Sequence, residues 1–188
     1  GWREWSFIKI ETDKRFNGWA ECTDTFKNLN GFCGIINDFK SLIIEEDALN
    51  IERIIWKLKL KSKSNPGSLI QRVISAIENA LWDIRGKYFL KPVYELFGKR
   101  KRKEMEIYWS HCGTTRVRTP KLLNKPAINS LKDVKDFCYE INKTDFRVIK
   151  TNLAIFKNGP QIYMPGHVFS FENPKLKLSK SILNEIIN

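Results

Sequence analysis

The stretch AIENALWDIRGKYFLKPVYELFG, from Ala76 to Gly98, decides how this 188-residue sequence folds. It continues an apolar stripe formed by Ile70, Val73, Ile74, Ile77, Leu81 and Ile84. Repeats of three and four residues place such side chains on one face of a helix. Pro92 favours the start of a further helical turn and Gly98 favours its end. The stretch therefore predicts a long amphipathic helix followed by a short helical turn.

The residues upstream predict a β-hairpin. Residues 5–12 alternate and are rich in aromatic and β-branched side chains, which is typical of a strand. Asn17-Gly18 is a strong turn signal, and residues 19–23 return as a second strand.

Helices are predicted between this hairpin and the long helix. Apolar residues from Phe32 to Phe39 follow a helical period, and Asp47 is expected to cap a helix with its apolar face between Ile51 and Leu58. Ser68 and Gln71 together resemble a capping box for the long helix. Strands followed by helices predict an α+β unit.

The pattern changes after a basic run at residues 99–103. A strand is predicted at residues 106–111, a helix at 130–142, a strand at 147–152 and a helix at 179–187. This alternation predicts βα units with parallel strands. Two such units neither close a barrel nor cover both faces of a sheet.

Composition narrows the classes of function. The net charge is +12, but lysines are spread along the whole sequence, and the run at residues 99–103 is interpreted as a solvated linker. We therefore expect no nucleic-acid partner. Because the sequence has no apolar stretch of about 20 residues and does not begin like a signal peptide, we expect no membrane partner and a cytoplasmic protein. Four scattered cysteines and two histidines argue against a zinc cluster.

Several motifs carry a resemblance to a known family. The stretch from Ala76 to Gly98 resembles the capping-domain signature of the mandelate racemase / muconate-lactonizing family of the enolase superfamily. The matching positions are Ala76, Ala80, Trp82, Asp83, Lys87, Pro92, Leu96 and Gly98. Asp83 is expected to make a structural polar contact. TDKRFNGWAECTD (residues 12–24) looks like the hairpin of the family, with Ala20 where glycine is common.

Other motifs indicate a branch of the family. YWSHCG (residues 108–113) and KTN (residues 150–152) resemble the acid-sugar dehydratases of the galactonate type. The resemblance implies an α+β capping domain at residues 1–104 whose first strand is missing. Residues 105–188 would form the first two βα units of an incomplete (β/α) TIM-type barrel, so that the chain is a truncated enzyme.

The resemblance also implies a chemistry. The family abstracts a proton next to a carboxylate and stabilises the enediolate on Mg²⁺. Its metal ligands are carboxylates at the ends of later barrel strands, which this sequence does not reach. Mg²⁺ is therefore expected in a full-length member, whereas no metal is expected in this chain, which alone should be inactive.

Lys150 is the candidate catalytic residue, as a base, an electrophile or a substrate holder. Asn152, where racemases of the family carry a second lysine, and His111 are candidate substrate contacts. The cap loop at residues 23–30 is expected to close over the substrate through Asp24, Asn28 and Asn30. The expected partner is a small-molecule acid sugar, and the full-length protein is expected to be a homo-oligomer.

Three functions stay open at this point. The leading one is a hydro-lyase acting on an aldonic or related acid sugar. The second is a racemase or cycloisomerase of the same family. The third is a non-catalytic, basic binding module.

Overall fold

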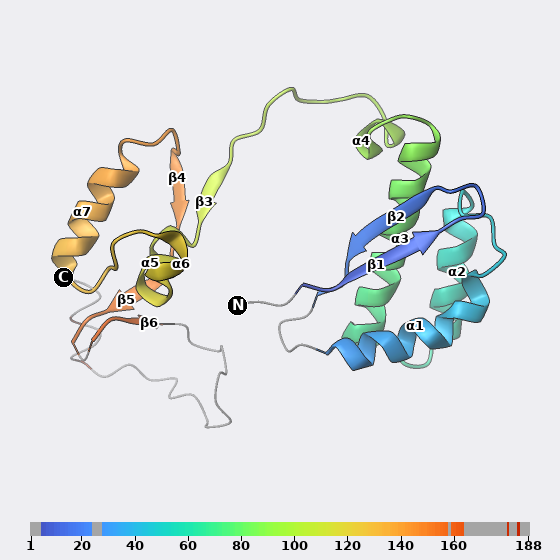
Figure 1. Ribbon diagram of the computed structural model, residues 1–188, viewed down its shortest axis with the longest axis horizontal. Coiled ribbons are helices and arrows are strands. Elements are labelled where there is room, and N and C mark those ends of the chain that lie inside the picture. Colours follow the sequence, from blue (N-terminus) through green and yellow to red (C-terminus); the bar gives the residue numbers. More distant parts are fainter. Residues whose placement is uncertain (1–4, 24–27, 158, 164–179, 181–183, 185–188) are drawn as a thin grey trace. The chain divides into compact units, whose positions relative to one another are not determined.

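The computed structural model describes residues 5–23, 28–157, 159–163, 180 and 184. It divides into two compact units, residues 1–103 and residues 104–188, which are considered separately below. The sequence placed its domain boundary between residues 104 and 105. Figure 1 traces the helices and strands of both units.

The first unit begins with an antiparallel hairpin. Strand β1 (Phe7–Glu11) pairs with strand β2 (Asn17–Glu21), with Ile8 opposite Ala20. The turn lies earlier than Asn17-Gly18, which are the first residues of β2. Arg15 is the left-handed residue of the turn, with φ 64°. The prediction that Asn17-Gly18 forms the turn was therefore wrong.

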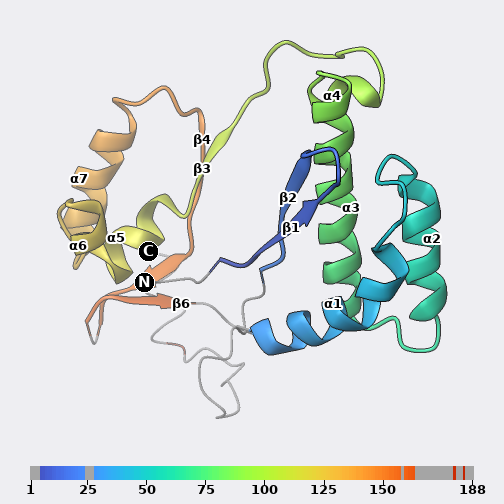
Figure 2. The same cartoon turned by 45° about the vertical axis from the view of Figure 1, so that its right-hand side comes forward.

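Four helices follow: α1 (Leu29–Ile43), α2 (Ile51–Lys61), α3 (Ser68–Tyr88) and α4 (Val93–Leu96). Figures 1 and 2 show the hairpin lying against α3, the longest of them. The predicted apolar stripe of α3 forms the centre of the core, with Val73, Ile77, Leu81 and Ile84 at most 2% exposed. The element order confirms the α+β prediction for this unit.

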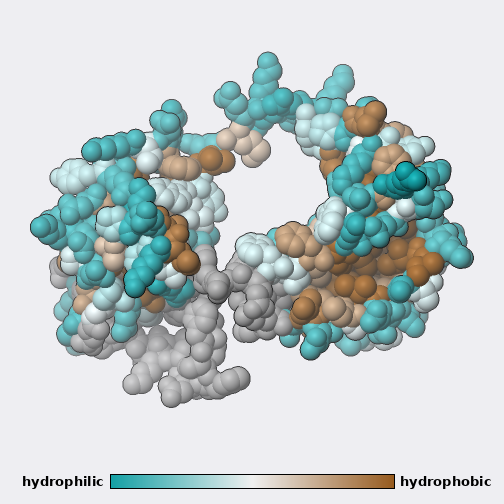
Figure 3. Space-filling view, viewed as in Figure 1, coloured by the Kyte–Doolittle hydropathy of each residue, from teal (hydrophilic) through white to brown (hydrophobic). Residues whose placement is uncertain are grey.

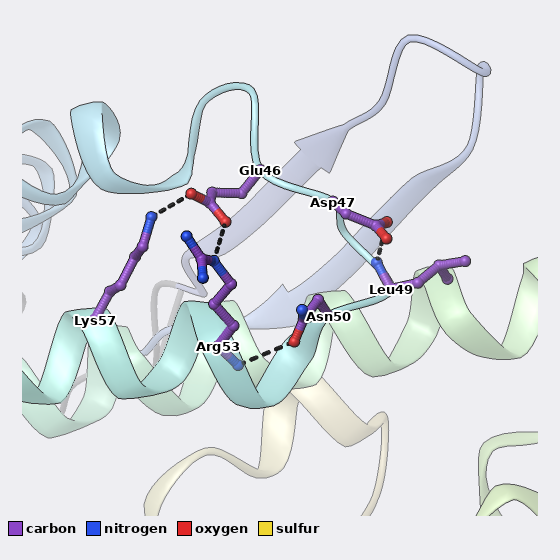
Figure 4. A network of polar contacts seen from close by, with 6 residues as sticks. All are labelled: Glu46, Asp47, Leu49, Asn50, Arg53 and Lys57. Atoms are coloured by element: carbon purple, nitrogen blue, oxygen red, sulfur yellow. Dashed lines mark hydrogen bonds and ion pairs between the residues drawn. The ribbon is translucent and has the colours of Figure 1, made fainter.

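Two helix starts differ from the predictions. Asn50, not Asp47, caps α2, because its side chain accepts a hydrogen bond from the Arg53 backbone N–H. The Asp47 carboxylate accepts from the Leu49 N–H in the preceding turn. Helix α3 starts at Ser68 itself, so the cap residue is Gly67 and no capping box forms. Figure 4 shows the first of these arrangements, in which Glu46 also binds Arg53 and Lys57.

The hairpin is fixed to α3 by a close backbone approach and by polar contacts. A Cβ atom on Gly18 would lie 1.9 Å from the Ala80 carbonyl oxygen, so only glycine allows β2 to lie so close to α3. The Asp83 carboxylate accepts hydrogen bonds from the Trp19 N–H at 3.0 Å and from Lys87 Nζ at 2.7 Å. The structural role expected for Asp83 is therefore confirmed.

A groove of about 850 Å³ opens between the hairpin and the helices of the first unit. Its apolar lining includes Ile8, Ile10, Ile36, Ile43, Ile54, Ile77 and Leu81. Figure 3 shows apolar surface gathered on this unit. Among the described residues β1 pairs only with β2, and the strand expected before residue 1 stays a prediction.

The second unit contains a parallel pair of strands. Strand β3 (Tyr108–Ser110) pairs with β4 (Val148–Lys150), with Ser110 opposite Lys150. The parallel pairing predicted for these segments is confirmed. Helix α7 (Leu131–Ile141) lies between them in sequence and packs Phe137 against Trp109 of β3, with ring centroids 5.9 Å apart.

The other elements of this unit were not predicted. Helices α5 (Cys112–Arg118) and α6 (Pro120–Leu123) follow β3 directly. Strands β5 (Leu153–Ile155) and β6 (Gln161–Tyr163) form an antiparallel hairpin after β4. The helix predicted at residues 179–187 lies outside the described residues except at Lys180 and Asn184.

The basic run at residues 99–103, the end of the first unit, is exposed, as expected for a solvated linker. The Arg100 guanidinium donates hydrogen bonds to the carbonyl oxygens of Arg102 and Lys103. In the described part of the chain, no helix combines the length and the apolar character needed to cross a membrane.

Candidate functional site

The candidate site lies in the second unit, at the carboxyl ends of β3 and β4. Ser110 and Lys150 are paired at these ends, and His111 and Asn152 follow within two residues. Because parallel strands end at the same edge, residues far apart in the sequence meet there. The structure thus places these residues at one edge of the strand pair and brings His111 into contact with Asn152.

His111 is the single residue between β3 and α5. Its backbone is left-handed, with φ 57° and ψ 27°, a conformation that non-glycine residues adopt uncommonly. Its ring nitrogen Nδ1 lies 3.2 Å from the Asn152 side-chain oxygen Oδ1. The tight connection therefore turns the imidazole toward the end of β4.

Thr114 also belongs to this cluster and was missed in the sequence. Its hydroxyl donates to Asn152 Oδ1 at 2.9 Å and accepts from the Asn152 backbone N–H at 3.3 Å. Thr114 is only 2% exposed, whereas Asn152 and His111 are half-buried. Thr114 follows His111 by three residues, about one helical turn, so the two side chains are neighbours on a helix. This spacing could have identified Thr114 if α5 had been predicted.

Lys150 lies on the face of the strand pair away from α7. Trp109 faces α7, and side chains alternate along a strand, so Tyr108 and Ser110 face the other way. The Lys150 ammonium lies 5.9 Å from the centroid of the Tyr108 ring, which places it on this second face. The side chain is exposed and available to an anionic group.

A buried arginine of α5 anchors this helix to its neighbours. Arg116 is 5% exposed and donates to the Pro126 carbonyl oxygen at 2.7 Å and to both carboxylate oxygens of Glu140, at 3.2 and 3.0 Å. These hydrogen bonds lower the pKa of the Glu140 carboxyl below its ordinary value. The ion pair fixes α5, and with it Thr114, against α7.

The candidate residues of the cap lie in the first unit. Asn28 directly precedes α1, and Asn30 is an exposed residue in its first turn, so the predicted loop is shorter than residues 23–30. Asp24 lies outside the described residues. The closing of this segment over Lys150 stays a prediction.

The described residues do not fit a magnesium site. Within them, no group of three or more histidine, cysteine, aspartate or glutamate side chains converges as metal ligands would. Cys112 is buried next to the site, and burial raises the pKa of its thiol, which disfavours the nucleophilic thiolate. The two strand ends can thus supply one cation from Lys150, and an imidazole and an amide from the His111–Asn152 pair.

The matching family model covers most of the first unit. The model of the "Mandelate racemase / muconate lactonizing enzyme, N-terminal domain" matches residues 3–98. The chain is also similar to a D-galactonate dehydratase of Variovorax paradoxus, with 34% identity over 105 residues. This alignment covers 55% of the chain and 27% of the relative.

Solved structures resemble both units. A Burkholderia xenovorans protein assigned as an L-alanine-DL-glutamate epimerase matches 100% of this chain and 47% of its own, with TM-score 0.87 and 30% identity. A second structure of that protein is bound to magnesium and fumarate. A Salmonella protein assigned as a dehydratase matches 80% of this chain and 37% of its own, with TM-score 0.68 and 27% identity. The chain therefore spans about half or less of the length of these relatives.

Proposed function

This chain belongs to the mandelate racemase / muconate lactonizing enzyme family, and from this premise we propose that it is part of a dehydratase acting on an aldonic or related acid sugar. The observation that supports the proposal is the position of Lys150, His111 and Asn152 at or just after the carboxyl ends of two adjacent parallel strands, where His111 contacts Asn152. The similarity to a D-galactonate dehydratase supports the substrate class.

Each of the three residues has a chemical role in this proposal. A proton next to a carboxylate is weakly acidic, and its removal builds negative charge on the carboxylate oxygens. The Lys150 ammonium, exposed on the face away from α7, holds the substrate carboxylate and stabilises that charge. His111 and Asn152 contact the hydroxyl groups next to it.

The metal belongs to the longer protein in this proposal. Mg²⁺ would neutralise the enediolate, but the described residues offer it no set of ligands. We therefore expect the 188-residue chain to show no Mg²⁺-dependent dehydration. Release of a 2-keto-3-deoxy acid from D-galactonate by the purified chain, abolished by a chelator, would contradict this expectation.

Epimerisation is the second candidate, since the structure with TM-score 0.87 is assigned as an epimerase. Two-sided proton transfer needs a base on each face of the substrate carbon. Asn152 occupies the position of a second lysine, and its amide oxygen is engaged by Thr114 and His111. An amide is no base, so this position favours dehydration.

A chimaera tests the two candidates directly. This chain would replace the structurally matching 47% of the Burkholderia protein, whose remaining half would complete the barrel. With Mg²⁺ we expect the chimaera to dehydrate D-galactonate, and Lys150→Met to reduce this activity at least 100-fold. The matched control is Lys143→Met, which removes an exposed lysine after α7. A folded chimaera that epimerises dipeptides and leaves aldonic acids unchanged would overturn the proposal.

We further propose that the protein works in the cytoplasm as a homo-oligomer. The four cysteines are all free, in accord with a reducing compartment. Exposed apolar side chains on α7, Leu131 at 63% and Tyr139 at 69%, favour burial against a second copy of the chain. Light scattering on the chimaera would measure the oligomeric state. A monomer at micromolar concentration would contradict the proposed homo-oligomer.

A further inference from the structure

The orientation of the Asn152 carboxamide, with Oδ1 toward Thr114 and His111, sets the polarity of the hydrogen bonds around it. The Thr114 oxygen accepts the Asn152 backbone N–H at 3.3 Å, and its own hydrogen is directed at Asn152 Oδ1, 2.9 Å away. A carbonyl oxygen only accepts. In this orientation of the Asn152 carboxamide, His111 Nδ1, 3.2 Å from the same oxygen, carries the hydrogen of the pair.

This assignment determines which atoms are left for a ligand. With the proton on Nδ1, the neutral imidazole presents Nε2 as an acceptor. Asn152 Nδ2 keeps two N–H donors. Neither of these two atoms has a hydrogen-bond partner among the described residues. Because every buried side-chain nitrogen in the described residues has such a partner, both atoms are reached by solvent.

We propose that Thr114 is a positioning residue that orients the Asn152 carboxamide and thereby selects the Nδ1–H tautomer of His111, so that Nε2 and Nδ2 form an acceptor–donor pair for a substrate hydroxyl. A hydroxyl group is the ligand that fits, because it donates to Nε2 and accepts from Nδ2 at once. The hydroxyl part of this inference rests on the proposed function, whereas the tautomer does not.

The left-handed backbone of His111 is a second observation in favour of this role. Such a conformation is unfavourable in a residue other than glycine and persists where the surroundings impose it. Here it is the conformation that brings Nδ1 to Asn152. Burial of Thr114 keeps water from replacing the hydroxyl in the network.

Long-range ¹H–¹⁵N spectra of the ligand-free chain would test the inference at about pH 8.5, where an ordinary imidazole is neutral. His111→Gln and His167→Gln would assign the two rings. We expect a protonated Nδ1 in His111 of the wild type, a shift toward protonated Nε2 in Thr114→Val, and recovery of the wild-type pattern in Thr114→Ser. Protonated Nε2 in the wild type, or a Thr114→Val spectrum that equals the wild type, would overturn it.

Titration with D-galactonate, with propionate as the control that lacks hydroxyls, separates the two proposals. If the hydroxyl part is right, D-galactonate shifts the Nε2 resonance, and Thr114→Val weakens its binding about tenfold while Thr114→Ser restores it. If D-galactonate binds equally well to both variants, the hydroxyl part is wrong. If it binds to no variant while the tautomer is as expected, the proposed substrate class fails and the role of Thr114 in selecting the tautomer stands.

Discussion

At the scale of single residues, His111 combines a ring that the site needs with a backbone conformation that favours glycine. Its φ of 57° is imposed by the direct passage from β3 into α5. The sequence identified His111 as a candidate from its strand-end position, but nothing in the local sequence signals a left-handed residue there. The left-handed backbone of His111 could not be predicted, because it depends on the start of α5 at Cys112 and the sequence analysis did not predict α5.

This conformation leads to a first prediction on stability. His111→Gly and His111→Ala both remove the ring, but only glycine relieves the backbone. We expect the glycine variant to be more stable than the alanine variant by about 1 kcal/mol in urea unfolding. Equal stabilities would mean that residue 111 is not left-handed in solution.

Glu140 gives a prediction with a pH dependence. Its folded-state pKa is lowered by the hydrogen bonds from Arg116, so the ion pair stabilises the fold above the ordinary glutamate pKa of about 4.3 and loses this effect as pH falls through the folded value. Glu140→Gln should therefore cost about 1–2 kcal/mol at pH 7 and progressively less below pH 4.

Urea unfolding at several pH values would measure this difference. Asp136→Asn is the matched control, because it removes the same charge from an exposed position of α7 and should change the stability little. A cost for Glu140→Gln that stays constant from pH 7 to pH 3 would contradict the assignment to the ion pair.

At the scale of elements, the segments with a long regular pattern were predictable and the short ones were not. Helix α3 follows from its apolar stripe alone. Helix α5 contains Gly113, Thr114 and Thr115, which are poor helix formers, and it is held by contacts from Thr114 and Arg116 to distant residues. Such tertiary contacts leave no trace in a local pattern.

Two glycines in the first unit should respond in opposite ways to the same substitution. Gly18→Ala places a methyl group 1.9 Å from the Ala80 carbonyl oxygen and should destabilise the unit by about 3 kcal/mol or more. Gly34→Ala lies in α1 with nothing within 4 Å and should stabilise it by about 0.5–1 kcal/mol. Thermal unfolding followed by circular dichroism would measure both. A well-tolerated Gly18→Ala would refute the close approach of β2 to α3.

At the scale of the whole molecule, the two units differ in how much they bury. Sixteen buried apolar residues form the described core of the first unit, whereas four form that of the second. Buried apolar area is the main source of stability. The sequence predicted both units, but the size of a core depends on tertiary packing, which no local pattern gives.

Hydrogen exchange should report this difference directly. We expect the amides of α3 to be protected most strongly and those of β3 and β4 to exchange faster in the monomeric chain, because sub-global opening needs less energy where fewer contacts are lost. Equal, strong protection of α3 and β4 in a monomer would contradict this prediction.

The order of the two cores along the chain also has a consequence for synthesis on the ribosome. The first core runs from Ile8 to Ile84, whereas β3 must wait for β4, which begins 40 residues later at Val148. At about 5–20 residues per second this wait lasts about 2–8 s, whereas hairpins and helices form within microseconds. The first unit should thus be folded while the Tyr108–Ser110 segment of the nascent chain is still unpaired, the interval in which a chaperone would bind it. Ribosome-bound chains halted before Val148 should accordingly resist protease in the first unit and be cut after it.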